Sequence, residues 1–198
     1  MSNSKSFVGI LLAGGLSRRY GTPKAFAMLN EQNFYQIAYQ ILLSICDEVV
    51  IVTRPEFTSR FPKDNHVIVD VEEFSGCGPL AGIYSGMDAI DAENYVVLPC
   101  DMPLMTTTIM KHLLTFHTKK VTIINTGDYL QPLVSVWDKE VKDVIYSFLK
   151  NGRFRITDVL KQTEVVEVDA SRLTETPQRF LNINTPQEDK EMRKWKGF

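Results

Sequence analysis

The chain has 198 residues, which fits one sizeable domain that can bury a core without disulfide bonds or structural metals. Apolar residues make up 44% and charged residues 23%, as in ordinary soluble domains. The formal net charge of -2 argues against a nucleic-acid binder, which usually carries a basic excess. We therefore expect a single domain over 1–198 whose partners include no nucleic acid, and any anion site must be local.

Short β-rich runs alternate with helical periods in the first half, which favours an α/β fold with a mostly parallel sheet. Residues 7–12 are apolar on both faces, as in a central parallel strand. The expected strands are 7–12, 48–53, 66–70 and 95–101. The expected helices are 34–45, 79–90 and 105–117.

The second half is less regular but continues the same pattern. The expected strands are 121–125, 130–137, 164–168 and a short edge strand at 181–184. The expected helices are 139–150, 156–161 and a polar terminal helix that begins after Thr185 and is expected to fray. We divide the single domain into halves, 1–105 and 106–198.

Membrane and redox signals are weak. The apolar stretch at 7–12 is too short for a signal sequence or a membrane span, so we expect no membrane partner. Cys46, Cys77 and Cys100 are widely spaced and form no C-x-x-C pair. They predict reduced thiols in a cytoplasmic protein rather than a disulfide frame or a zinc site.

The stretch LLAGGLSRRYGTPKAF at 11–26 follows the first expected strand. Gly14 and Gly15 would allow a positive φ and a close approach of backbone N–H groups to an anion. Arg18, Arg19 and Lys24 add positive charge. The spacing matches neither the Walker A pattern nor G-x-G-x-x-G, and the alternative is a surface turn with solvated basic residues.

Asp101 directly follows the fourth expected strand, so it should lie at the same sheet edge as 13–24. A lone carboxylate there suits Mg²⁺, which usually binds one or two carboxylates together with phosphate oxygens and water. The alternative is an aspartate that caps the following turn. Cys100 is interpreted as a small buried residue rather than a nucleophile.

A glycine-rich turn at 70–86 feeds the second expected helix. Gly76, Gly78 and Gly82 would let a flat base or sugar lie against the backbone, and Asp70 could accept hydrogen bonds from it. A helix-entry loop explains Pro79 but not the glycines. Four other positions are weaker candidates, since basic turns and turn-forming amides explain them as well: Arg153, Arg155, Gln131 and Asn182.

Together these motifs resemble the molybdenum cofactor guanylyltransferases, a family of nucleotidyltransferases. The resemblance covers nearly the whole chain in order. It rests on Leu12-Ala-Gly-Gly-x-Ser-x-Arg19-x-Gly-x-x-Lys24, Gly78-Pro-Leu-Ala-Gly82, Pro99-Cys-Asp101-x-Pro103 and Asn182-x-Asn184-Thr-Pro186. The family commonly has Met where this chain has Tyr20, a position we expect to be packing. The asparagine that some relatives carry after the second strand is absent, so no residue of 52–54 is assigned.

The resemblance implies a three-layer Rossmann-like fold with nucleotide-binding (1–105) and molybdopterin-binding (106–198) halves. It implies transfer of GMP from GTP to molybdenum-molybdopterin with release of pyrophosphate. Lys24 and Asp101 would contact GTP, Asp101 would also bind Mg²⁺, and Arg19 and Lys24 would neutralise charge. The further nucleotide contacts implied are Leu12, Ala13, Gly14, Gly15, Asp70, Gly78, Pro79 and Leu80.

The second half would hold molybdopterin near Arg153, Arg155, Gln131 and Asn182. Protein partners implied are the molybdenum-insertion protein and the acceptor apoenzyme or its chaperone. Two enzymatic alternatives are a molybdopterin cytidylyltransferase and a sugar-phosphate nucleotidyltransferase, although relatives using CTP more often read Leu-Ala-Ala-Gly. The third alternative is a GTP-binding accessory protein without catalysis.

Overall fold

A seven-stranded sheet forms the centre of the computed structural model, which describes residues 6–15, 17, 20–127 and 129–194. The strand order is β5-β4-β1-β6-β8-β7-β9. Neighbouring strands are parallel, except that β8 is antiparallel to both β6 and β7. The strands are β1 (Phe7–Leu12), β4 (Glu48–Thr53), β5 (His66–Val69), β6 (Asn94–Pro99), β7 (Val121–Asn125), β8 (Leu130–Asp138) and β9 (Val165–Asp169).

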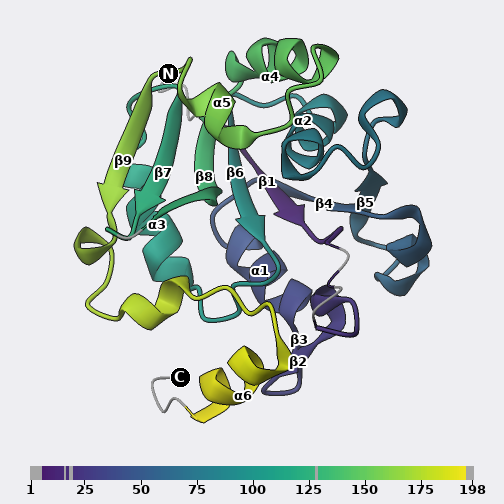
Figure 1. Cartoon of the computed structure of the whole chain (residues 1–198), viewed down its shortest axis with the longest axis vertical. Helices are drawn as coiled ribbons and strands as arrows, with labels where there is room; N and C mark the ends of the chain where they lie inside the picture. Colours follow the sequence, from purple (N-terminus) through teal and green to yellow (C-terminus); the bar gives the residue numbers. More distant parts are fainter. Residues whose placement is uncertain (1–5, 16, 18–19, 128, 195–198) are drawn as a thin grey trace.

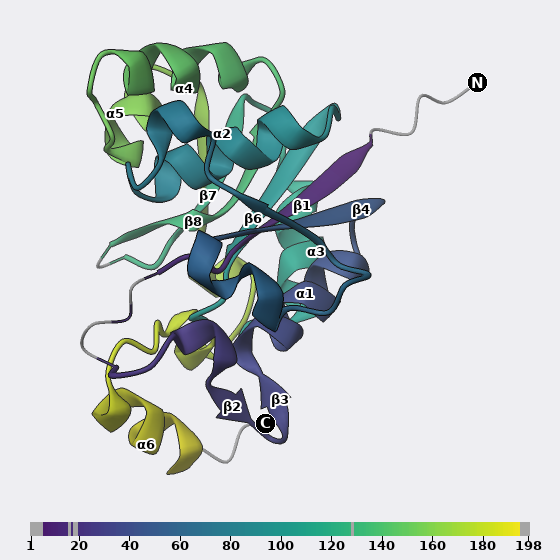
Figure 2. The same cartoon turned by 90° about the vertical axis from the view of Figure 1, so that its right-hand side faces the viewer.

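Helices cover both faces of the sheet and give three layers, as Figures 1 and 2 show. α1 (Phe34–Leu43) and α3 (Thr107–Thr115) pack on one face. α2 (Pro79–Ala89), α4 (Val141–Lys150) and α5 (Ile156–Leu160) pack on the other. The expected three-layer α/β architecture is confirmed.

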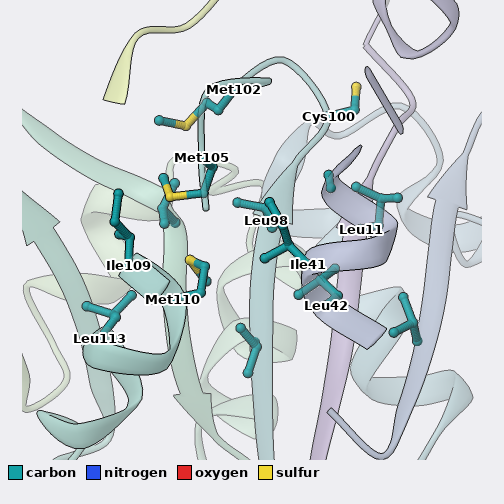
Figure 3. Packing of buried hydrophobic residues seen from close by; sticks show 14 of the residues in the cluster. Leu11, Ile41, Leu42, Leu98, Cys100, Met102, Met105, Ile109, Met110 and Leu113 are labelled. Carbon is teal, nitrogen blue, oxygen red and sulfur yellow. The ribbon is translucent and has the colours of Figure 1, made fainter. Parts of the chain in front are cut away.

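The central strand is apolar on both faces because it contacts both helical layers. Ile10 belongs to the core beneath α2 and Leu11 to the core beneath α1, and neither side chain is exposed. Figure 3 shows the second of these cores, where Leu11 of β1 and Leu98 of β6 lie near Ile41 of α1 and Met110 of α3. These contacts fix the two strands whose ends carry the candidate site.

The chain changes direction across the sheet at β1. It passes from β1 to β4 and β5 on one side and then returns to β6 on the other side. Leu12 is in register with Val52 of β4 and with Pro99 of β6, so three strands end at nearly the same level. Ligands of open α/β sheets bind at such a switch point, outside the carboxyl ends of the strands.

Residues 181–184 are not a strand, so that expectation is wrong. The Ile183 N–H donates one backbone hydrogen bond to the Asp101 carbonyl oxygen, at 2.8 Å. Its side chain is buried in a small cluster with Leu29 and Phe34. The alternation of apolar residues in this segment therefore reflects the one buried side chain of Ile183. It does not reflect the repeated backbone hydrogen bonds of a strand. Residues 28–33 form a small hairpin that we did not expect, β2 (Met28–Leu29) and β3 (Gln32–Asn33).

The terminal helix α6 (Pro186–Lys194) begins where we expected. Thr185 Oγ1 accepts the Glu188 N–H, and the Glu188 carboxylate accepts the Thr185 N–H, which is a capping box. The helix has tertiary contacts over 186–194, and the expectation that it frays stays a prediction.

Two contacts anchor α6 to the first half of the chain. The Tyr20 hydroxyl donates to the Asp189 carboxylate at 3.1 Å, and Met192 is buried in the cluster around Leu29. Tyr20 also packs against that cluster, which confirms its expected packing role. Figure 2 shows α6 next to the β2–β3 hairpin. None of the helices within the described ranges has the length and hydrophobicity that crossing a bilayer requires.

Glycine on α2 lets the helix lie close to β1, and this makes a prediction. A Cβ atom at Gly86 would lie 2.8 Å from Cδ1 and Cγ1 of Ile10, a fully buried β-branched side chain. We expect Gly86→Ala to lower the free energy of unfolding by about 1–3 kcal/mol through overpacking, despite the better helix propensity of alanine. Urea unfolding measures this.

Gly15→Ala is the matched control, because nothing lies within 4 Å of a Cβ atom there. It should change the unfolding free energy by less than about 0.5 kcal/mol. Equal stability of the two variants would contradict the close packing of α2 on β1.

Candidate functional site

A cavity of about 440 Å³ opens at the carboxyl ends of β5, β4, β1 and β6. Most of its wall comes from the segments that follow these four strands, and the start of α2 closes one side. Within the part of the chain that the structure describes, the second half contributes only Leu133 to this wall. The lining includes Leu12, Ala13, Gly14, Gly15, Lys24, Asp70, Gly78, Pro79 and Asp101.

The loop after β1 keeps the direction of its strand for two more residues. The Ala13 N–H donates to the Val52 carbonyl oxygen at 2.8 Å, and Thr53 Oγ1 donates to the Ala13 carbonyl oxygen at 3.2 Å. Neither Gly14 nor Gly15 has a positive φ, so that part of our reason for those glycines is wrong, while the close approach of an anion stays a prediction. Gly15 instead faces open space, which leaves its backbone accessible to a ligand.

Ser17 has a left-handed backbone with a φ of 49°, and Gly21 in the same loop has a φ of 86°. The Ser17 carbonyl oxygen accepts the N–H groups of Tyr20 and Gly21, and the Ser17 hydroxyl oxygen accepts the Lys24 N–H at 3.0 Å. Ser17 therefore returns the chain toward the sheet edge and places Lys24 there. Sequence reasoning gave Ser17 no role. Arg18 and Arg19, expected to add charge, lie outside the described residues.

Lys24 is buried and contacts the carboxylate that we assigned to Mg²⁺. Its Nζ lies 2.6 Å from Asp101 Oδ2 and 2.8 Å from Asn184 Oδ1, and both contacts are hydrogen bonds. The lysine side chain is 11% exposed and the aspartate side chain 22%. A buried ammonium requires such partners, because an uncompensated buried charge is strongly unfavourable.

The segment before α6 completes this cluster of Lys24, Asp101 and Asn184, which we call the charge cluster. The Ile183 N–H binds the Asp101 carbonyl oxygen, and the Glu188 carboxylate accepts the Asn184 N–H at 2.6 Å. Asn184 is thus held from both sides. Its contact with Lys24 spans 160 residues of sequence, so no local pattern indicated it.

Asp70 lies at the other end of the cavity. Its Oδ2 accepts the Gly76 N–H at 3.2 Å, and Gly76 and Gly78 have positive φ values of 75° and 84°. Burial raises the pKa of the Asp70 carboxyl, while the Gly76 N–H and the charge of Arg54 act in the opposite direction. The glycines thus fold the loop back onto Asp70, a contact that the sequence analysis did not predict, and the contact of Asp70 with a nucleotide stays a prediction.

Several expected site residues do not present their side chains to the cavity. Leu80 is fully buried in the core under α2, so only its backbone could contact a ligand. Gln131 is buried and donates its amide to the Phe180 carbonyl oxygen at 3.1 Å. Arg153 forms an ion pair with Asp158 and lies over the Phe148 ring. Asn182 and Arg155 are exposed.

The segment after β4 supplies wall residues that sequence reasoning left unassigned. Thr53, Arg54 and Pro55 line the cavity between Gly14 and Asp70. The Arg54 guanidinium is ion-paired with Glu56. The available signal was position alone, because any residue that directly follows a parallel strand near the switch point borders the cleft.

The cysteines behave as expected. All three are free thiols, and burial raises the pKa of the Cys100 thiol to about 12. Burial disfavours the thiolate, which agrees with the interpretation of Cys100 as a small buried residue.

The described residues hold no group of three or more metal-ligating side chains. The carboxylates facing the cavity are those of Asp70 and Asp101. This donor set fits Mg²⁺, since this ion keeps waters and takes phosphate oxygens along with one or two carboxylates. It does not fit a metal that needs a full set of protein ligands.

The fold and the position of this cavity define an α/β protein with a ligand cleft at the switch point of its sheet. Comparison with known families is consistent with that class. Residues 9–166 match the model of the MobA-like NTP transferase domain. The chain belongs to this family and is a nucleotidyltransferase.

Individual relatives agree with the family. A protein of Bacillus subtilis named probable molybdenum cofactor guanylyltransferase is 40% identical over 183 residues, which are 90% of each chain. A crystal structure of molybdopterin-guanine dinucleotide biosynthesis protein A from Archaeoglobus fulgidus has a TM-score of 0.80, with 24% identity over 94% of this chain and 97% of that one. A putative protein from Aquifex aeolicus has a TM-score of 0.70, with 28% identity and coverages of 93% and 96%.

The raised pKa of Asp70 predicts how the stability of the protein depends on pH. A carboxyl whose pKa is higher in the folded than in the unfolded state favours folding below its unfolded pKa and loses that contribution as the pH rises through its folded pKa. We therefore expect Asp70→Asn to stabilise the ligand-free protein at pH 7, with the Gly76 N–H still bound by the amide oxygen.

Urea unfolding of both proteins across pH measures the effect. The gain of the variant should shrink as the pH falls and vanish below the ordinary aspartate pKa of 3.8, where wild-type Asp70 becomes protonated in both states. A variant less stable than the wild type by the same amount at every pH would contradict the burial effect.

Proposed function

We propose that the chain transfers GMP from GTP to molybdenum-carrying molybdopterin and releases pyrophosphate. The charge cluster carries this proposal, because it puts a buried lysine and an aspartate beside the open backbone of Gly15. The names of the relatives supply the chemistry, since a close match is named for guanylyl transfer. The molybdopterin substrate is likewise inferred from those names.

The nucleotide would lie along the sheet edge. Its triphosphate would lie at the loop after β1, near Lys24 and Gly15, which both line the cavity. Its base and ribose would reach the glycine loop, where Asp70 can accept hydrogen bonds from N–H or O–H donors. Guanine presents N–H donors on its Watson–Crick edge, which suits a carboxylate.

The reaction makes modest demands on acid–base groups. A phosphate oxygen of molybdopterin attacks the α-phosphorus of GTP, a new P–O–P bond forms, and the bond to the α–β bridging oxygen breaks. Pyrophosphate leaves with that electron pair. Because the nucleophile is already an anion, the protein must align two polyanions and offset their charge.

Lys24 would neutralise the charge of phosphate oxygens. The backbone N–H groups of Gly14 and Gly15, which line the same cavity, would bind them as well. Asp101, together with triphosphate oxygens, would hold Mg²⁺, which supplies charge neutralisation for the leaving pyrophosphate. Arg19, outside the described residues, would add a further positive charge. Leu12, Ala13 and Pro79 would shape the cavity wall.

The acceptor would occupy the side formed by residues 106–198. A second cavity of about 600 Å³ lies there, lined by the turns that follow β7 and β9 and by residues 174–181. Its position at the carboxyl ends of β7 and β9 puts it on the same sheet edge as the first cavity. This supports a nucleotide half and a molybdopterin half.

We further propose a cytoplasmic enzyme that hands its product to the acceptor apoenzyme or its chaperone.

Pyrophosphate release tests the function directly. With molybdenum-carrying molybdopterin and Mg²⁺, GTP should support release at a kcat/KM at least about tenfold above that for CTP, ATP or UTP, since hydrogen-bonded base recognition gives large discrimination. A preference for CTP would identify a cytidylyltransferase. Release with a sugar phosphate instead of molybdopterin would identify a sugar-phosphate enzyme.

Variants of the charge cluster distinguish an enzyme from an accessory protein that binds GTP without catalysis. Lys24→Ala should lower kcat/KM on the order of 10²-fold, as removal of one charge-stabilising group does, and Asp101→Ala should abolish turnover. Lys119→Ala, which removes an exposed lysine paired with Glu164, is the control and should retain activity. Cofactor maturation that survives Asp101→Ala would indicate a non-catalytic accessory protein.

A further inference from the structure

The ammonium of Lys24 already binds one of the two carboxylate oxygens of Asp101, the residue that we expect to bind a divalent cation. The Lys24 Nζ atom is 2.6 Å from Asp101 Oδ2, which is closer than a neutral hydrogen bond requires. A cation bound at that oxygen would lie within a few ångströms of the ammonium, and the two positive charges would repel each other strongly in this partly buried place. A cation that binds through Oδ2 therefore has to displace the ammonium from this oxygen.

Lys24 cannot simply release Asp101 into an empty cavity. The residue is only 9% exposed, so its charge would lose its carboxylate partner without regaining water. A second anion must replace the carboxylate. The cavity that borders Lys24 is the one in which we place the triphosphate, and phosphate oxygens are stronger partners for an ammonium than the Asn184 amide is.

We propose that Lys24 closes Asp101 to divalent cations until nucleotide phosphates replace Asp101 as the partner of its ammonium. This inference rests on the proposed function, because it takes the triphosphate as the incoming anion. Metal and nucleotide then bind with positive coupling, each raising the affinity of the other by the same factor. Without nucleotide, the Lys24 ammonium already neutralises the Asp101 carboxylate, so the metal binds weakly.

Asn184 acts as a positioning residue in this arrangement. Its amide oxygen accepts from Lys24 Nζ at 2.8 Å, while its own backbone N–H is held by the Glu188 carboxylate. The next N–H toward the N-terminus, that of Ile183, binds the carbonyl oxygen of Asp101 itself. One short segment therefore fixes the lysine and the aspartate relative to each other.

Binding of Mn²⁺ to the full chain, followed by electron paramagnetic resonance of the free ion, tests the proposal without turnover. Without nucleotide, Lys24→Met should bind Mn²⁺ at least about tenfold more tightly than the wild type, because the competing charge is gone. Lys24→Met combined with Asp101→Asn should lose that gain. Lys119→Met, which opens an exposed lysine–glutamate pair, is the control and should match the wild type.

Asn184→Ala tests the positioning role in the same assay. It should tighten Mn²⁺ binding severalfold without nucleotide, because Lys24 then holds Asp101 less firmly. A merely structural role would leave Mn²⁺ affinity unchanged while lowering the midpoint of thermal unfolding. That result would overturn the part of the proposal that concerns Asn184.

The wild type supplies an independent measurement. A GTP analogue with a methylene group between the α- and β-phosphorus atoms should bind more tightly with Mn²⁺ than without it, and the coupling factor should fall in Lys24→Met. Equal Mn²⁺ affinity of the wild type and Lys24→Met would overturn the proposal even if guanylyl transfer proceeds. Failure of guanylyl transfer with the Mn²⁺ shift intact would overturn only the proposed reaction.

Discussion

The contact between Lys24 and Asp101 joins parts of the chain that are otherwise separate. The lysine ends the loop after β1, the aspartate follows β6, and Asn184 brings in the segment before α6. Burying an ammonium is unfavourable unless its partners are fixed, so each of these segments must hold its position. The apolar cores on both faces of β1 and β6 provide that fixed frame. The rest of the site is arranged around the pair.

Sequence reasoning predicted the frame well because the frame is local and repetitive. The apolar runs of β1 and β6 and the helical stripe of α1 are visible in the amino-acid order, and their ends pointed to Gly14 and Asp101. Position alone therefore brought most of the expected cavity residues together. The pairing of Lys24 with Asp101 was not visible, since it depends on the return of the chain at Ser17.

What the sequence patterns did not reveal has one main physical cause, namely contacts between residues far apart in the chain. Residues 181–184 alternate like a strand, but long-range burial of Ile183 explains the pattern better than a ladder. The terminal helix is polar, yet the contact between Asp189 and Tyr20 holds it across 169 residues of sequence. Arg153 and Gln131 have intramolecular partners that their residue types did not reveal, and their contact with a substrate stays a prediction. Patterns of a few residues cannot specify such distant partners.

The reversed direction of β8 has a consequence for how the molecule can vary. Because β8 is antiparallel to β6, the turn that precedes it, and not the one that follows it, lies at the edge that carries both cavities. Changes in the length of that turn would reshape the second cavity. They would leave the pairing of β6 with β1 unchanged, and this pairing places Asp101 at the first cavity. The second cavity could therefore change to fit a different acceptor while the first cavity keeps the same nucleotide chemistry.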